Sequence, residues 1–312
     1  MNTAKSIAIL GTGAWGSALG KIVRSNGHDV RFWSHRGEIP IGDVVANAAI
    51  ILSAVSMKGV IPTIAKLQPL DLPADRIIVT ATKGLDSETT RTPSQIWQSA
   101  FPNNSVVVLS GPNLAKEIAK SLPAATVLAS KNLQAARQVQ SILASDNFRA
   151  YVNEDPTGTE LGGTIKNVIA IASGVCDGAK LGTNAKAALL TRALPEMIRI
   201  GTYLGASAET FFGLSGLGDT IATCQSPLSR NYQVGYGLAE GKPLEQILAT
   251  LEGTAEGINT TNVLIEIANR EAIAVPIARQ VHRLLNGKVT PMKAIQALME
   301  RDLKPEFCDL DL

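Results

Sequence analysis

The chain has 312 residues, of which 45% are hydrophobic and 18% charged, so it is long enough for two domains with well-filled cores. A net charge of +2 without a basic block argues against nucleic-acid binding, and only 4% of residues are aromatic. No apolar run is long enough to span a membrane, and the N-terminal one is too short for a signal sequence. Three cysteines without metal-ligand spacing indicate a reduced, cytoplasmic protein with no metal site.

A glycine cluster follows the first apolar run, Ile7 to Leu10. Gly11, Gly13 and Gly16 have the spacing G-x-G-x-x-G, and apolar residues recur after them at helical spacing. A strand, a tight turn and a helix in this order are typical of dinucleotide-binding domains. There the glycines allow the sharp turn, the approach of a pyrophosphate and the packing of helix on strand. A glycine-rich turn without a ligand is the alternative, because the motif alone is a weak signal.

The residues after the second predicted strand, Asp29 to Trp33, bear on the choice of cofactor. An acidic residue at this point would bind the ribose 2′-OH of NAD(H). The first acid here is Glu38, whereas His35 and Arg36 directly follow the strand end. Arg36, together with His35, suits the 2′-phosphate of NADP(H), although an ordinary polar loop would look similar. We therefore expect NADP(H) to be preferred and NAD(H) to be possible.

The nucleotide-binding domain is predicted to be abbreviated after this second strand. The next strand-like run, Ala49 to Val55, begins only about a dozen residues after Arg36, and one crossover connection alone takes roughly that length. The sheet should therefore lack the strand that normally lies beyond Asp29 to Trp33. The adenine side of the cofactor site should then be open.

Further strands alternate with helices up to about residue 153. The predicted strands are Ile77 to Ala81, Val106 to Leu109, Ala125 to Ala129 and Arg149 to Val152, with helices at Ala115 to Ala119 and Gln134 to Leu143. Ligands of such sheets bind at the carboxyl ends of the strands. Lys83 and Gly111 lie just after two of these ends and are therefore candidates for ligand binding.

Beyond residue 153 the pattern becomes almost entirely helical. We therefore expect an α/β domain at residues 1–153 and an all-α domain at residues 154–312. The apolar helix from Leu161 to Ser173 carries Lys166. A lysine is seldom buried without a partner, so Lys166 is either functional or extends from the helix edge into solvent.

Later polar motifs in this half have two interpretations each. Asp219, after two glycines and before an apolar run, is a candidate site residue or a helix N-cap. Ser229, Arg230 and Asn231 together could bind a phosphate, or they could form a helix cap with a surface arginine. Glu256 lies in a turn or at the start of a helix.

These motifs together resemble the bacterial-type NAD(P)-dependent glycerol-3-phosphate dehydrogenases. The resemblance covers nearly the whole chain and rests on Gly11-Thr-Gly13-Ala-Trp15-Gly16, Lys83-Gly84, Gly111-Pro112, Thr164-Ile-Lys166-Asn167, Gly216-Leu-Gly218-Asp219, Ser226-Pro-Leu-Ser229-Arg230-Asn231 and Ala255-Glu256-Gly257. It implies an N-terminal Rossmann domain for the cofactor and an all-α C-terminal domain that closes the substrate site. It also implies a homodimer that interconverts dihydroxyacetone phosphate and sn-glycerol 3-phosphate, supplying the latter for phospholipid synthesis.

The same resemblance assigns roles to individual residues. Lys166 matches the proton acceptor, with Asp219 and Lys83 as further catalytic residues. The positions that match cofactor contacts are Gly11, Gly13, Ala14, Trp15, Gly16, His35, Arg36, Lys83, Ala115, Arg230, Thr254 and Glu256. The positions that match contacts with the phosphate substrate are Lys83, Gly111, Asn113, Lys166, Asp219, Ser229, Arg230 and Asn231.

The chain departs from the family pattern at three places. The usual helix and strand between Arg36 and Asp43 are missing, Asn113 replaces a serine, and Ser56 replaces a proline. The first departure keeps open a catalytically inactive NAD(P)-binding sensor or scaffold.

A dehydrogenase of the related 3-hydroxyacid type is the other alternative. The SPLSRN and GLGD motifs count against that enzyme, and the intact Lys83, Lys166 and Asp219 count against an inactive protein.

Overall fold

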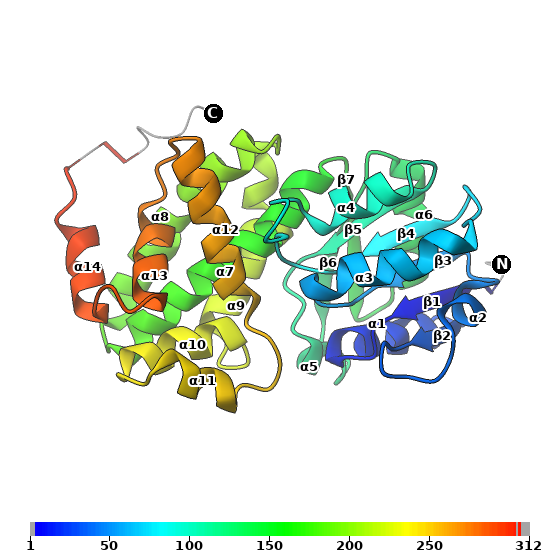
Figure 1. The fold of residues 1–312 in the computed structure, drawn as a ribbon, viewed down its shortest axis with the longest axis horizontal. Helices are drawn as coiled ribbons and strands as arrows, with labels where there is room; N and C mark the ends of the chain where they lie inside the picture. Colours follow the sequence, from blue (N-terminus) through cyan, green and yellow to red (C-terminus); the bar gives the residue numbers. More distant parts are fainter. Residues whose placement is uncertain (1–3, 304, 307–312) are drawn as a thin grey trace. The chain divides into compact units, whose positions relative to one another are not determined.

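The computed structural model describes residues 4–303 and 305–306. These residues form two compact units, an α/β unit and a helical one (Figure 1). The first unit contains the chain up to Asp86 together with Arg91–Glu160, and the second contains Ser87–Thr90 together with the chain from Leu161. An α/β part followed by a helical part is the organisation predicted from the sequence.

The division between the units differs from the one expected at residues 153 and 154. Helix α7 (Pro156–Gly178) begins just after that point, but its first residues pack with the first unit, so the division falls between Glu160 and Leu161. The short segment Ser87–Thr90 also groups with the second unit. Both features depend on contacts between distant parts of the chain, which a local sequence pattern does not reveal.

The first unit is built on a seven-stranded sheet with the order β2-β1-β3-β4-β5-β6-β7. Its strands are β1 (Ser6–Leu10), β2 (Asp29–Trp33), β3 (Ile50–Ser53), β4 (Ile77–Thr80), β5 (Ser105–Ser110), β6 (Ala124–Ala129) and β7 (Phe148–Asn153). Neighbouring strands are parallel except β5 and β6, which are antiparallel. The strands predicted from the sequence are confirmed, with small shifts at their ends.

An apolar core covers each face of this sheet, as expected for buried parallel strands with continuous apolar runs. Ile9 and Leu52 face one core and Leu10 and Ile51 the other, because successive side chains of a strand point to opposite faces. The helices of this unit are α1 (Ala14–Ser25), α2 (Ile41–Val45), α3 (Met57–Leu67), α4 (Pro93–Ala100), α5 (Ala115–Ile118) and α6 (Leu133–Leu143), with a 3₁₀ turn at Gln68–Leu70. Helices α1 and α6 pack on the first core, and α2, α3 and α4 on the second (Figure 1).

The predicted abbreviation after the second strand is confirmed. Within the described residues β2 is an edge strand, and its connection to β3 contains only the five-residue helix α2. The edge of the sheet is therefore placed at β2, where the sequence indicated that another strand would not fit.

The regular secondary structure in the described part of the second unit is entirely helical. Besides α7, its helices are α8 (Gly182–Tyr203), α9 (Asp219–Gln225), α10 (Arg230–Ala239), α11 (Leu244–Thr250), α12 (Glu256–Arg270), α13 (Pro276–Leu285) and α14 (Pro291–Met299), with a 3₁₀ turn at Ala208–Phe212 and a π-helical turn at Leu214–Gly218. Helices α7 and α10 are in close contact, because a Cβ at Gly235 would lie 1.8 Å from the carbonyl oxygen of Ile171. None of the described helices is long and apolar enough to cross a bilayer.

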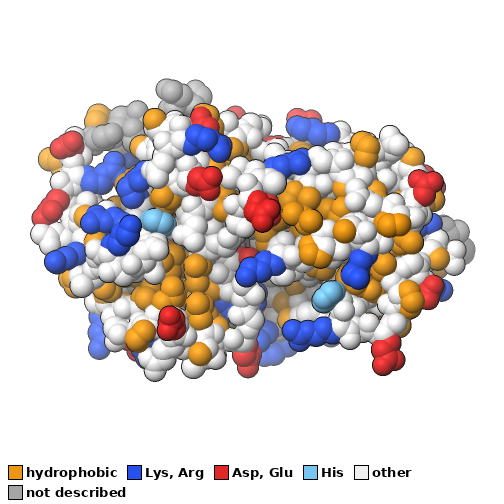
Figure 2. Space-filling model, in the orientation of Figure 1, with side chains coloured by type: hydrophobic (Ala, Val, Ile, Leu, Met, Phe, Trp, Pro, Cys, Tyr) orange, Lys and Arg blue, Asp and Glu red, His pale blue; other side chains and the backbone are white. Residues whose placement is uncertain are grey.

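The charged side chains do not form a single basic surface on the face shown in Figure 2. Lysine and arginine side chains lie among aspartates and glutamates there. This distribution agrees with the small net charge of +2.

Candidate active site

The glycine turn between β1 and α1 has the geometry of a phosphate cradle. Gly11 has a φ of +111°, and a Cβ there would lie 2.8 Å from the carbonyl oxygen of Ala54. A Cβ at Gly16 would lie 2.0 Å from the carbonyl oxygen of Gly11, so neither position has space for a side chain. A Cβ at Gly13 would meet nothing within 4 Å, so its backbone faces open space.

The start of α1 is suited to an anion. Gly13 is the N-cap, no described side chain caps the helix, and its first turn holds no acid. The N–H groups of Ala14 and the residues after it therefore point out of the helix end, where phosphate binds most readily. The pyrophosphate of a dinucleotide fits this turn.

Other residues predicted to bind the cofactor also belong to the first unit. Trp15 and Ala115 are half-buried against the core on the α1 face of the sheet. His35 and Arg36 are exposed in the loop after β2. The His35 ring makes an edge-on contact with Trp33 at a centroid distance of 6.4 Å. The loop thus exposes the Arg36 guanidinium just beyond the end of β2.

The turns after β4 and β5 meet at the carboxyl ends of these strands. Lys83 Nζ donates a hydrogen bond of 3.2 Å to the carbonyl oxygen of Gly111, whose φ is +153°. Asn113 Nδ2 donates to the carbonyl oxygen of Ala125 at 3.0 Å, and Thr126 Oγ1 donates to Asn113 Oδ1 at 2.9 Å. The asparagine that replaces the usual serine therefore fixes this turn. Three predicted substrate positions are brought together here.

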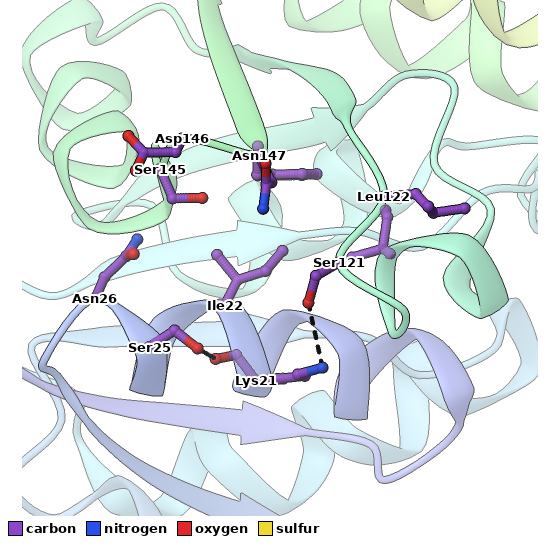
Figure 3. A pocket seen from close by; sticks show the side chains of 11 residues that line it. Lys21, Ile22, Ser25, Asn26, Ser121, Leu122, Ser145, Asp146 and Asn147 are labelled. Atoms are coloured by element: carbon purple, nitrogen blue, oxygen red, sulfur yellow. Dashed lines mark hydrogen bonds between the residues drawn. The ribbon is translucent and has the colours of Figure 1, made fainter.

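A separate hollow of about 290 Å³ lies at the other end of α1 (Figure 3). Lys21, in the C-terminal half of the helix, and Asn26, its C-cap, line the hollow away from the glycine turn. Lys21 Nζ donates to the carbonyl oxygen of Ala119 at 2.7 Å and to Ser121 Oγ at 3.3 Å. This lysine therefore ties α1 to the end of α5, the helix that begins with Ala115, and the hollow is not the dinucleotide site.

In the second unit Lys166 is buried together with two oxygen-bearing side chains. It lies on α7 with 7% of its surface exposed, and its Nζ is 3.2 Å from Asp219 Oδ1. Lys166 Nζ also donates to Thr223 Oγ1 at 2.5 Å, and Thr223 Oγ1 donates to Asp219 Oδ1 at 3.1 Å. A buried ammonium group needs such a partner, so Lys166 is not a lysine that extends into solvent.

Sequence analysis missed Thr223 as a member of this group. Asp219 begins α9, and Thr223 lies four residues later on the same helix face. The four-residue spacing is visible in the sequence, but no motif marks Thr223. Asp219 is an ion-pair partner at the start of α9, whereas Gly218 occupies the N-cap position.

Helices α7, α10 and α12 converge around a glycine. Asn231 Oδ1 accepts a hydrogen bond of 2.9 Å from the backbone N–H of Gly257. A Cβ at Gly257 would lie 2.8 Å from the carbonyl oxygen of Asn167, the neighbour of Lys166. Ser229 is the N-cap of α10 and accepts from the backbone N–H of Tyr232 at 3.2 Å, so the helix-cap interpretation of this serine is correct.

Arg230 is exposed beside the segment that precedes α12. A Cβ at Gly253 would lie 2.5 Å from Arg230 Nη1, so the arginine side chain lies along this backbone. Thr254 is exposed and Glu256 half-buried at the start of α12. The predicted positions Arg230, Thr254 and Glu256 thus belong to one region of the second unit.

Comparisons with known proteins agree with these features. The family model described as "NAD-dependent glycerol-3-phosphate dehydrogenase N-terminus" matches residues 6–41 and 38–136, and the corresponding C-terminal model matches residues 155–296. The two pieces of the N-terminal match meet in the shortened connection between β2 and β3.

Individual relatives are similar over nearly their full lengths. A protein named glycerol-3-phosphate dehydrogenase [NAD(P)+] from Acaryochloris marina is 64% identical, with 98% of each chain covered. One of the same name from a Synechocystis strain is 60% identical, covering 100% of this chain and 98% of that protein. A crystal structure of glycerol-3-phosphate dehydrogenase from Coxiella burnetii is 35% identical with a TM-score of 0.91, covering 96% of this chain and 99% of that one.

Proposed function

We propose roles for the site residues on the premise that this chain belongs to the NAD-dependent glycerol-3-phosphate dehydrogenase family. The chain is an NAD(P)-dependent oxidoreductase that interconverts dihydroxyacetone phosphate and glycerol 3-phosphate. The observation that best supports activity, as against an inactive NAD(P)-binding protein, is the buried contact of Lys166 with Asp219 and Thr223. A charged group is costly to bury, and replacing a buried ion pair by apolar side chains is often neutral or stabilising, so a buried pair of this kind points to a role in the reaction.

Lys166 is the proton donor and acceptor of the reaction. When bound, the nicotinamide cofactor supplies or accepts the hydride. Reduction of the ketone requires an acid at the carbonyl oxygen, and oxidation of the alcohol requires a base at the same oxygen. The ammonium group of Lys166 can give that proton and the neutral amine can take it back. Asp219 and Thr223 hold its nitrogen at one place by the contacts of 3.2 and 2.5 Å.

Lys83 is mainly an electrostatic and positioning group. It lies where β4 ends, and its bond to the Gly111 carbonyl fixes the direction of its ammonium group. A cation at this end of the sheet attracts the substrate phosphate and the developing negative charge on the carbonyl oxygen.

Arg230 and Asn231 bind the substrate phosphate. The bond from Gly257 N–H to Asn231 Oδ1 orients the amide so that its Nδ2 can donate elsewhere. Arg230 offers a guanidinium group at the exposed start of α10, and guanidinium is well matched to phosphate. Ser229 supports both residues as the helix cap.

The cofactor preference is NADP(H) over NAD(H). Arg36 is exposed directly after β2, and no acid precedes Glu38 in this loop. The N-terminal part of α1 binds the pyrophosphate, with Trp15 and Ala115 nearby in the same unit.

A homodimer in the cytoplasm completes the proposal. Cys176 and Cys224 are free thiols, which suits a reducing compartment, and light scattering of the purified protein tests the dimer.

The reaction is tested by following NADPH absorbance in the near ultraviolet after adding dihydroxyacetone phosphate. Oxidation that depends on this substrate is the expected result. Oxidation with a 3-oxoacid but not with the triose phosphate would favour the alternative dehydrogenase. Binding of NADPH with no oxidation by either substrate would favour a sensor or scaffold.

A further inference from the structure

A second buried acid lies on the helix that carries Lys166, and the mechanism above does not use it. Glu160 is 1% exposed and belongs to the first unit. Its Oε1 accepts from the backbone N–H of Ser94 at 2.9 Å, and its Oε2 accepts from the Ser94 hydroxyl. The Thr92 hydroxyl also hydrogen-bonds to this carboxyl group.

Helix α4 does not require Glu160 as a cap. Thr92 already accepts from the backbone N–H of Gln95, and the Gln95 side chain accepts from the backbone N–H of Thr92, so a complete capping box is present. Burial raises the pKa of Glu160 from 4.5 to about 7, which reflects the cost of placing an ionised carboxyl group here. The ionised carboxyl group of Glu160 is costly to bury and is not needed to cap α4, so its presence calls for another explanation.

The two ends of this contact lie near the two candidate lysines in the chain. Ser94 is the second residue of α4, the helix that follows the connection in which Lys83 lies. Glu160 lies six residues before Lys166 on α7, which is one continuous helix from Pro156 to Gly178. At ~1.5 Å per residue the two side chains leave the helix only about 9 Å apart along its axis. A helix is stiff over this length, so a bond at Glu160 restricts where Lys166 can lie.

We propose that Glu160 is a positioning residue that fixes α7 to the start of α4 and thereby sets the orientation in which α7 presents Lys166. The inference rests on the proposed role of Lys166 as acid and base. Asp155 caps α7 through its bond to the N–H of Gly158 at 2.9 Å, but that bond is local to the helix. The Glu160 contact spans 66 positions of sequence and restrains the first turns of α7 against α4, whereas later turns of α7 contact α9 and α10.

The test compares Glu160→Met, which keeps the bulk and removes both acceptors, with Glu160→Gln, which keeps an acceptor for the Ser94 N–H. A small displacement of a catalytic group can cost up to ~10²-fold in rate, so Glu160→Met should lower kcat about 10- to 100-fold. The KM for NADPH should change little. Glu160→Gln should recover most of the lost kcat. With C4-deuterated NADPH, Glu160→Met should show a larger isotope effect on kcat than the parent, because a misplaced acid slows the chemical step.

Glu196 provides a matched control. It is also a buried acid, 3% exposed, and accepts from the backbone N–H groups of Ile277 and Ala278 at the start of α13. It does not lie on α7. Glu196→Met should lower the melting temperature while leaving kcat and the isotope effect of the folded enzyme near the parent values.

Several outcomes would overturn the inference. A folded Glu160→Met enzyme with parental kcat and isotope effect would do so, and so would equal losses of kcat in the Glu160 and Glu196 variants. If Glu160→Met does not fold, Ser94→Ala removes the hydroxyl donor alone, and an unchanged kcat in that variant rejects the proposal. Lys166→Ala, assayed in parallel, separates the two claims. If it retains kcat, the role of Lys166 fails; if it is inactive while Glu160→Met is normal, only the role of Glu160 fails.

Discussion

Lys166 combines burial with an ion pair and a hydrogen bond to its ammonium group. Asp219 neutralises the ammonium group and Thr223 accepts a hydrogen bond from it, so the cost of removing the charge from water is largely offset. The presence of a lysine inside an apolar helix could be predicted from the sequence, and so could Asp219 as a candidate site residue. Thr223 could not, because its role depends on the direction in which α9 leaves the preceding π-helical turn.

Arg36 gives a prediction about the cofactor. A hydrogen bond between charged groups is worth about 1.5–3 kcal/mol, or roughly ten- to a hundredfold in affinity. Arg36→Ala should therefore raise the KM for NADPH by about this factor and leave the KM for NADH unchanged. Steady-state kinetics with each cofactor measure the effect. Equal kcat/KM values of the parent for NADPH and NADH, or an unchanged KM for NADPH in the variant, would contradict it.

Glu196 gives a prediction about stability and pH. Burial raises the pKa of its carboxyl group from 4.5 to about 7, so between these values the folded protein binds a proton that the unfolded chain has released. The contribution of this group to stability is complete below pH 4.5 and is lost as the pH rises towards 7 and above. A shift of this size corresponds to about 3 kcal/mol. The amide introduced by Glu196→Gln does not titrate, so this variant should not lose stability at this position as the pH rises.

Urea unfolding of parent and Glu196→Gln at pH 4.5 and pH 8 tests the sign. The free energy of unfolding of the parent, relative to the variant, should be higher at the lower pH. Glu160 has its pKa raised into the same range, but it is present in both proteins and cancels in the difference. A difference that is the same at both pH values, or larger at high pH, would contradict the prediction.

At the scale of elements, local signals identify most of the fold. The apolar run before Gly11, the close approach at Gly16 and the start of α1 follow directly from the glycine spacing. The short distance between Arg36 and the next strand correctly predicts that β2 is an edge strand. The assignment of Ser87–Thr90 to the second unit could not be predicted, because it depends on long-range packing.

The shortened connection after β2 makes a prediction about adenine recognition. Only the five residues of α2 are helical between β2 and β3, so little protein is available to contact the base. Replacing adenine by hypoxanthine in reduced NADP should therefore change KM very little. Loss of a neutral hydrogen bond to the base would raise KM about two- to tenfold. A rise of this size, with no change in kcat, would show that the protein does contact the adenine.

At the scale of the whole molecule, function could be predicted because the motifs occur in order along nearly the entire chain. The glycine turn and the Lys83 turn lie in the first unit, and Lys166, Asp219, Arg230 and Asn231 lie in the second. Under the proposed roles neither set is sufficient for the reaction by itself, since the first would bind the cofactor and the second would handle the proton. The ordered set of motifs therefore identifies the family more specifically than any single motif does. The Glu160 contact, by contrast, becomes visible only in the folded chain.

The most direct measurement is the turnover of Lys166→Ala beside Lys83→Ala, with circular dichroism to show that both variants are folded. Loss of a general acid costs ~10²–10⁴-fold in rate, so Lys166→Ala should lose kcat by this factor while binding NADPH nearly as the parent does. Lys83→Ala should first raise the KM for dihydroxyacetone phosphate, as expected when a binding contact is lost. A folded Lys166→Ala enzyme whose kcat stays within a few-fold of the parent would contradict the assignment and make Lys83 the leading candidate for the acid and base.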